Sequence, residues 1–226
     1  DISRKEMDEV ALRSHNAAER ATNDGSFKDE IVQVSVPQRR KDPVIFDKDE
    51  HFRPGITMEQ LSALAPAFVP KIGKVTAGNS SGINDGSTGM VIMSGSKAKD
   101  LGLTPMARIK ATSRGACHPS VMGLSPVPAV KNLIKSSKIE LSDFELIEVN
   151  EAFAGQYLAC EKQLGLNRGI VNVNGSGISL GHPVGATGLR LLVTRSWEMK
   201  RRQVQYGLAT LCVGGGMGKT VILGAV

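Results

Sequence analysis

Apolar side chains near the start of the chain recur at helical spacing. Between Met7 and Ala21 they fall every three or four positions and so share one face. Ser3 and Glu6 form a capping box before this segment, and Asn23-Asp24-Gly25 follows it. The pattern predicts a helix that begins after Ser3 and ends near residue 23.

The segments that follow are short and differ in character. Residues 31–36 read as a strand that Pro37 stops, and a polar stretch runs from 39 to 53. A second capping box, Thr57 to Gln60, predicts a short helix. Residues 74–89 are rich in Gly, Ser, Asn and Asp, which favours a loop that runs close to a ligand.

The rest of the chain alternates apolar strands with helices. We expect strands at 90–93, 108–112, 144–149, 170–173, 207–213 and 220–226, the first of them buried. We expect helices at 96–101, 128–136, 152–164 and 186–203, and a loop at 174–185. This alternation predicts a layered α/β fold, with a domain boundary near Leu103-Thr104-Pro105.

Composition and charge narrow the possible partners. With 226 residues, of which 41% are hydrophobic, the chain can form one large domain or two small ones. The net charge of +6 favours an anionic partner, or is merely solvated surface charge. Aromatic residues are only 4%, and the basic clusters 39–41 and 200–202 are short, so a small phosphorylated ligand fits at least as well as nucleic acid. We expect neither a nucleic-acid nor a membrane partner.

Cysteine and histidine usage gives no metal or disulfide signature. The three cysteines are Cys117, Cys160 and Cys212, and the four histidines are His15, His51, His118 and His182. None of the cysteines forms a Cys-x-x-Cys pair, so we expect no metal site. The charged first residues lack the apolar core of a secretory signal, which predicts a cytoplasmic protein.

Three loops, each at the end of an expected strand, could carry chemistry. His182 lies between Gly181 and Pro183, so a fixed turn would present its imidazole as a general base needs. A histidine that only caps or covers the surface is the alternative, but the glycines around it allow a ligand to approach closely.

The second loop follows Cys212, which meets three glycines. Amides in such a turn can form an anion-binding hollow that would stabilise a thiolate. A buried structural cysteine is the alternative, which we favour for Cys117 and Cys160. In the third loop the Asn150 amide could hold a water or an oxygen, while Glu151 is an equal candidate unless it only stabilises a helix N-terminus. Together these groups suit acyl or enolate chemistry.

Four separated motifs resemble the thiolase family closely. They are residues 76–86, 150–153, 172–188 and 212–218, with Ser176 a small departure where many members carry glycine. The resemblance implies a thiolase-like layered α/β fold comprising the C-terminal half and the tail of the loop domain. We expect residues 1–83 to be that tail, 84–104 the last elements of the N-terminal domain, and 105–226 the C-terminal domain.

The resemblance also implies roles in an acyl-CoA acetyltransferase. His182 would take the proton of the thiol that becomes acylated, and Cys212 would move the proton of the second acyl group. Asn150, through a water, and His182 would bind one thioester oxygen, and the Gly214 amide the other. Further CoA-binding or acyl-binding positions would be Arg53, near the phosphates, with Phe68, Ala77, Ser81, Met122, Ala152 and Phe153.

The acylated cysteine matches none of the three present, so we expect it in a segment before Asp1. The chain alone would then be inactive, and residues 84–104 would expose apolar surface unless another chain covers them. The complete protein would form or cleave a 3-ketoacyl-CoA such as acetoacetyl-CoA, as a homodimer or homotetramer. It would use coenzyme A or acetyl-CoA as substrate and no covalently bound cofactor. A non-catalytic CoA-binding fragment is the alternative.

Overall fold

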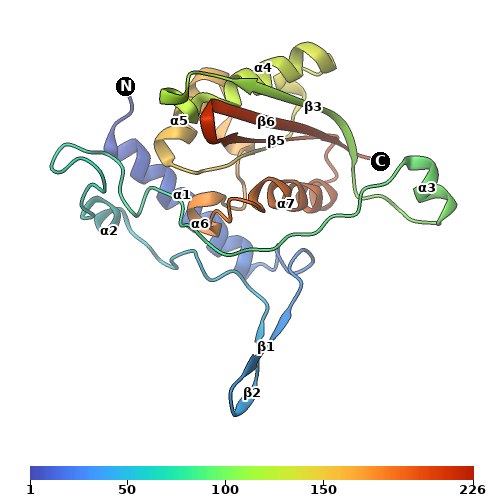
Figure 1. The fold of residues 1–226 in the computed structure, drawn as a ribbon, viewed down its shortest axis with the longest axis horizontal. Coiled ribbons are helices and arrows are strands. Elements are labelled where there is room, and N and C mark those ends of the chain that lie inside the picture. Colours follow the sequence, from blue (N-terminus) through green and yellow to red (C-terminus); the bar gives the residue numbers. More distant parts are fainter.

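The computed structural model describes residues 1–226, and a mixed four-stranded sheet lies at its centre (Figure 1). The strands are β3 (Arg108–Ala116), β4 (Leu146–Val149), β5 (Tyr206–Val213) and β6 (Met217–Gly224). They lie in the order β3, β6, β5, β4; β4 runs parallel to β5, and the other neighbours are antiparallel. This is the layered α/β fold that the sequence predicts.

Helices cover both faces of the sheet. Helix α4 (Pro126–Ser137) packs on β3 and β6, and α7 (Thr187–Arg202) packs on β4 and β5 from the opposite side (Figure 1). Successive residues of β4 serve the two faces: Ile147 joins the main core, and Leu146 packs with Met199 of α7. The strand pattern therefore builds two apolar layers around one sheet.

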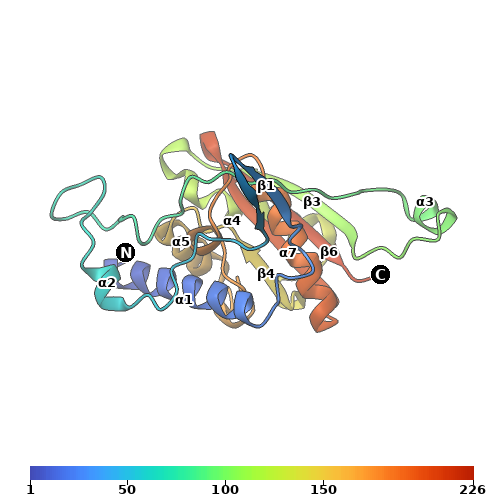
Figure 2. The same cartoon turned by 90° about the horizontal axis from the view of Figure 1, so that it is seen from below.

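A second group of helices borders this body. Figure 2, seen from below, shows α1 (Arg4–Asn23) along its outside, where it contacts α5 (Ala154–Leu164) and α6 (Gly177–Leu180). The other elements are α2 (Met58–Ser62), α3 (Gly95–Asp100), and short 3₁₀ segments at Pro119–Leu124, Leu141–Asp143, Arg168–Ile170 and Gly214–Gly216. None of the helices combines the length and apolar character that a membrane-spanning segment requires.

Local capping signals were reliable. The Ser3 side chain accepts from the Glu6 amide, while the Glu6 carboxylate accepts from the Ser3 amide at 2.7 Å. Thr57 and Gln60 form the same box at the start of α2. Gly165, at φ 65°, ends α5. These boundaries confirm the predicted helices.

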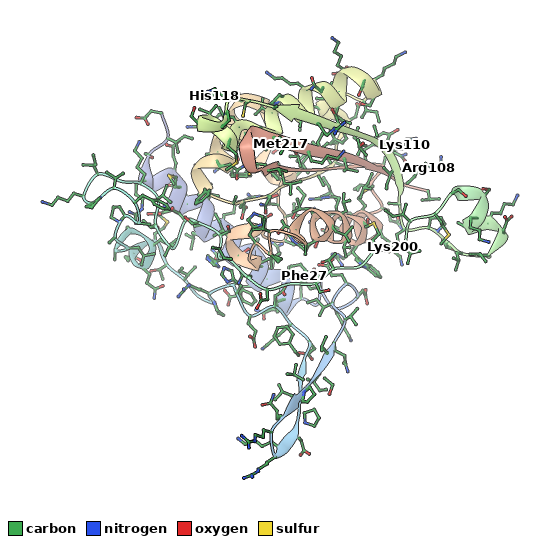
Figure 3. All side chains as sticks on the ribbon, in the orientation of Figure 1. Phe27, Arg108, Lys110, His118, Lys200 and Met217 are labelled. Carbon is green, nitrogen blue, oxygen red and sulfur yellow. The ribbon has the colours of Figure 1, made fainter.

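The segment after α1 departs from prediction, because it forms a hairpin rather than one strand and a polar stretch. Strands β1 (Val34–Gln38) and β2 (Lys41–Phe46) pair antiparallel and project from the body, with their side chains in solvent (Figures 1 and 3). Pro37 does not stop the strand, since the register shifts there and leaves the proline outside the ladder.

Residues 90–93 do not form the expected buried strand. They are extended but have no partner strand, and Val91 is 84% exposed. An apolar run predicts a strand only where another strand can pair with it. The expectation of exposed apolar surface between 84 and 104 is confirmed, as Ile92, Leu101 and Leu103 are also more than half exposed.

The strand expected at 170–173 is reduced to two isolated bridges, one between Ile147 and Val171 and one between Val173 and Gly175. Asn172 has a φ of 48°, which a strand cannot accommodate. Its side chain instead makes the hydrogen bonds that the backbone of a neighbouring strand would make. Oδ1 accepts from the Val149 amide and Nδ2 donates to the Val149 carbonyl, both at 2.8 Å. The loop expected at 174–185 also contains the short α6.

Candidate active site

A cavity of about 490 Å³ opens beside the end of β5. The turn that follows β5 lies at the end of the sheet marked by Met217 in Figure 3. Nine of the residues expected at the site line this cavity: Phe68, Ala77, Ser81, Met122, Ala152, Phe153, His182, Cys212 and Gly214. Segments far apart in the sequence therefore meet there, and the remaining walls are mainly apolar.

The turn that carries His182 is held from both sides. It follows α6 through Gly181, whose φ of 86° suits glycine. The backbone amide of His182 donates to the Gly82 carbonyl and to Asn84 Oδ1, each at 3.2 Å. The imidazole is thus presented on a fixed backbone, as the Gly-His-Pro sequence predicts.

The Nδ1 side of the His182 ring has a defined hydrogen-bond partner. Nδ1 lies 2.7 Å from the Thr187 hydroxyl, which itself donates to the Pro183 carbonyl at 2.9 Å. The hydroxyl therefore accepts from Nδ1–H, which leaves the lone pair on Nε2. Burial lowers the pKa of His182, and the positive charge of Arg190 lowers it further. The ring is thus a neutral base at neutral pH.

Asn150 brings its amide to the same ring. Its Nδ2 lies 3.4 Å from His182 Nε2, and its backbone amide donates to the Thr210 carbonyl of β5 at 3.0 Å. The buried Oδ1 has no hydrogen-bond partner within the protein. A Cβ at Gly177 would come within 2.8 Å of that oxygen, so only glycine fits beside it.

Glu151, the equal candidate from spacing, is held away from the cavity. Ser14 Oγ donates to its Oε2 at 2.5 Å, and Asn172 Nδ2 donates to its Oε1 at 2.8 Å. Burial raises the pKa of this carboxyl, with the Ser14 hydrogen bond opposing the shift. Asn150 is fully buried and does not itself line the cavity, but its side chain lies against the His182 ring. Glu151 instead joins α1 to the segment that follows β4.

The thiol of Cys212 is buried at the end of β5. Gly215 and Gly216 then turn the chain at φ values of 76° and 89°. We expected this turn to stabilise a thiolate, but the direction is the opposite, because burial raises the pKa of Cys212. The sulfur is a protonated thiol at neutral pH and becomes a strong base once it loses that proton.

The expected CoA-binding positions divide into two groups. Ser81 donates its amide to the Ala152 carbonyl at 3.0 Å, so the two sides of the cavity are joined there. Arg53, in contrast, does not line the cavity. Its side chain is exposed, and its backbone amide donates to His15 Nδ1 at 3.2 Å. A place for Arg53 near the CoA phosphates stays a prediction.

Cys117 and Cys160 lie outside the cavity walls. Cys160 is fully buried within α5, and Cys117 is half-buried beside the carbonyls of Val121 and Gly216. No group of three or more histidine, cysteine or carboxylate side chains is placed to share a metal ion.

Sequence reasoning missed the two residues that hold His182. Thr187 lies at the first position of α7, where a hydroxyl is ordinarily interpreted as a helix cap. Its spacing of five residues from His182 could have suggested a contact back across the turn. Asn84 lies within a matched motif, but the sequence contains no signal for the partner of its side chain.

Comparisons with known proteins identify the family. Two family models match: the thiolase N-terminal domain over residues 1–96 and the thiolase C-terminal domain over residues 103–225. The acetyl-CoA acetyltransferase of Cupriavidus necator is 51% identical over 217 residues, which cover 96% of this chain and 55% of that protein.

Solved structures share the fold over the whole chain. The crystal structure of the Bacillus anthracis acetyl-CoA acetyltransferase has a TM-score of 0.97 at 51% identity and covers 100% of this chain, which spans 57% of that one. Human mitochondrial 3-ketoacyl-CoA thiolase in complex with CoA has a TM-score of 0.91 at 40% identity, with coverages of 100% and 55%. The fold is thus a thiolase-like α/β fold.

The chain belongs to the thiolase family. It spans about half the length of the curated relatives it matches. The three domain ranges expected from the sequence, 1–83, 84–104 and 105–226, stay predictions.

Proposed function

We propose that this chain binds an acyl-CoA and supplies the base, the second cysteine and most CoA contacts of a thiolase that forms or cleaves a 3-ketoacyl-CoA such as acetoacetyl-CoA. The observation that carries the proposal is that His182, Cys212 and Gly214 line one cavity, with Asn150 against the His182 ring. Acyl transfer needs a base, a proton carrier and oxygen-binding donors at one place.

In the proposed reaction His182 acts at Nε2. This nitrogen accepts the proton of the thiol that becomes acylated, and Thr187 accepts from Nδ1–H and stabilises the imidazolium that forms. The lowered pKa of the ring keeps it available as a base at neutral pH. None of the three cysteines present is proposed as the acylated one, so that thiol would come from outside these 226 residues.

Cys212 transfers the proton at the α-carbon of the second acyl group. The thiol first releases its own proton, to the departing CoA sulfur in the full reaction or to water in the isolated chain. The resulting thiolate removes a proton from the α-carbon of an acetyl-CoA, and the electron pair of that C–H bond becomes the enolate. Once Nε2 of His182 carries a proton, it donates to the enolate oxygen together with a water on Asn150, and the Gly214 amide binds the other thioester oxygen. Because burial raises the pKa of Cys212, its thiolate is a stronger base than an exposed one.

The CoA arm would follow the apolar wall of the cavity. Phe68, Ala77 and Ser81 line that wall, and Met122 and Phe153 would border the acyl group. Backbone and small side chains at 76–83 allow a thin pantetheine chain to approach closely. Arg53 would bind phosphate beyond the cavity mouth, where its guanidinium is exposed.

A CoA-binding fragment without catalysis is the second candidate, which is favoured for the isolated chain because none of its three cysteines is proposed as the acylated one. It predicts the same binding but no proton transfer. A homodimer or homotetramer of the complete protein stays a prediction.

Exchange of the α-protons of acetyl-CoA in D₂O tests the proposal, since this half-reaction needs Cys212 but not the acylated thiol. We expect the 226-residue chain to exchange these protons faster than buffer, with the rate read by mass spectrometry. Cys212→Ser should lower that rate by about a hundredfold or more. Cys117→Ser is the matched control and should leave it unchanged, because this thiol lies outside the cavity walls.

The outcomes separate the candidates. CoA binding without exchange supports the binding fragment. Exchange that survives Cys212→Ser contradicts the proposed base. Binding of an oligonucleotide that CoA does not displace points to a nucleic-acid binder instead. Thiolysis of acetoacetyl-CoA by this chain alone would rule out the need for an external thiol.

A further inference from the structure

A histidine that the proposed chemistry does not use lies directly behind the His182 turn. His51 Nδ1 is 3.2 Å from Nδ2 of Asn84. The same Asn84 side chain accepts the backbone amide of His182 on its Oδ1, also at 3.2 Å. A single asparagine amide therefore links the ring of His51 to the backbone of the base.

The contact is built tightly on both sides of Asn84. A Cβ at Gly82 would come within 2.5 Å of His51 Cε1 and 2.7 Å of Asn84 Oδ1. A Cβ at Gly181 would come within 2.6 Å of the same oxygen. Only glycine fits at either position without a shift of these side chains, so His51 and the His182 turn both pack closely against the part-buried Asn84.

The hydrogen-bonding roles in this chain are determined by its chemistry. Oδ1 of Asn84 must accept, because the His182 amide can only donate. Nδ2 of Asn84 must then donate to His51, whose Nδ1 has to be unprotonated. The groups that act on His51 are Arg53 and Asp49 in its own segment and the backbone of Ile178 on α6, while His51 itself acts on His15 of α1. Burial and then the charge of Arg53 lower the pKa of His51, which keeps it neutral, against smaller effects of Ile178 and Asp49.

We propose that His51 and Asn84 are positioning residues for the base: the unprotonated Nδ1 of His51 orients the Asn84 amide, which in turn fixes the backbone of His182. When His51 gains a proton, two donors face each other and the asparagine amide must turn or move. The His182 amide then keeps only the Gly82 carbonyl.

This inference rests on the proposed function, since that function gives the placement of His182 its purpose. The contact itself is independent of CoA. It can therefore be measured on the chain without CoA. A negative result for the His51 contact does not affect the proton-exchange test, and a negative proton-exchange test does not affect the His51 contact.

Hydrogen exchange of the backbone amide at position 182, followed by NMR on the ¹⁵N-labelled 226-residue chain, tests the link. His51→Leu removes the acceptor, and we expect this amide to exchange about fivefold faster, the factor of one ordinary hydrogen bond. His51→Gln should restore much of the protection, because its side-chain oxygen can accept from Asn84. His118→Leu is the control, since that histidine is exposed and its ring bonds only to Ser120.

A pH titration provides a second test that does not require a His51 variant to fold. In a His182→Gln chain the ring at 182 cannot contribute, and we expect the amide signal at 182 to shift with the midpoint of the His51 ring. The proposal is overturned if the amide signal at 182 does not shift as His51 titrates. It is also overturned if this amide exchanges equally fast in wild type and His51→Leu.

Discussion

At the scale of single residues, burial keeps both His182 and Cys212 uncharged by shifting their pKa values in opposite directions. Burial disfavours the charged form of each, so it lowers the pKa of the imidazole and raises the pKa of the thiol. Both groups are neutral at neutral pH, one with a lone pair and the other with a proton. Such a pair is suited to passing a proton without holding a permanent charge in the cavity.

The contact between Thr187 and His182 yields a prediction for the ring. Thr187→Val keeps the shape but removes the oxygen that accepts from Nδ1–H, so the ring loses its defined tautomer. We expect acetyl-CoA proton exchange to fall by about tenfold or more, with rescue in Thr187→Ser. The ring ¹⁵N shifts of His182 report the tautomer directly. Thr194→Val, on the same helix but bonded to Glu30, is the control that should leave those shifts unchanged.

The raised pKa of Cys212 predicts its reactivity. Only the thiolate reacts with iodoacetamide, so the alkylation of Cys212 should increase at a higher pH than that of a cysteine in an unfolded peptide. Peptide mass spectrometry after short pulses at stepped pH measures this for the folded chain. Reaction at neutral pH as fast as in the peptide would show that the glycine turn stabilises the thiolate after all.

Much of the site was visible in the sequence, and the rest was hidden for physical reasons. Glycines beside His182 and Cys212 mark backbone turns, which are local and hence predictable. The choice between Asn150 and Glu151 depends on which side chain finds a distant partner. Ser14, more than a hundred residues away, decides it by bonding to Glu151.

At the scale of elements, the predicted helices were more accurate than the predicted strands. The end of α1 is set by its own capping groups, whereas a strand exists only if a partner pairs with it. Residues 90–93 lack that partner and stay extended. Strand β2 was missed because polar residues and Pro43 make its sequence unlike that of a strand. It forms because the chain turns at Arg40, which lets β2 pair with β1.

The β5–β6 turn gives a prediction at this scale. Gly216 has a φ of 89°, and a Cβ there would collide with the Cys117 carbonyl. We expect Gly216→Ala to lower the free energy of unfolding by roughly 1–3 kcal/mol through backbone strain. Gly89→Ala, at a position with open space around it, should change it little. Denaturant unfolding of both variants makes the comparison, and equal stability would contradict the strained turn.

At the scale of the whole molecule, α7 is joined to the sheet and to the segment before the hairpin by buried charges. Arg195 donates to Glu148 of β4 at 2.6 Å, and Arg190 reaches the same carboxylate at 3.3 Å. Thr194 donates to Glu30 at 3.1 Å. These contacts connect residues far apart in the sequence, so no local pattern could predict them.

The Glu30 carboxyl makes stability depend on pH. Burial raises its pKa from 4.5 to about 7, against the Thr194 hydrogen bond. Between these pH values the folded state holds a proton that the unfolded chain has released, so the stability from this group is present below 4.5 and is lost as pH rises through 7.

Replacing this carboxyl removes that dependence. We expect Glu30→Gln to gain stability over wild type by on the order of 3 kcal/mol as the pH rises across that window. Glu50→Gln is the control, because that carboxylate is exposed. Chemical unfolding at stepped pH measures both differences, and a constant difference for Glu30→Gln would contradict the buried carboxyl.

The exposed apolar segment is the other feature of the whole molecule. Val91 is 84% exposed and Ile92 67% exposed, on a stretch that leads to α3 at the edge of the body (Figure 1). The sequence predicted this surface through its resemblance to longer relatives, although the same apolar pattern wrongly predicted a buried strand.

The central claim is that His182 and Cys212 act on one thioester. Isotope-filtered NOE spectroscopy of the chain with saturating acetyl-CoA, carrying ¹³C at its methyl group, tests this most directly. The account predicts NOEs from that methyl group to both the His182 ring and the Cys212 side chain, because the two line one cavity. Bound acetyl-CoA whose methyl group lies near neither residue, or near only one of them, would contradict it.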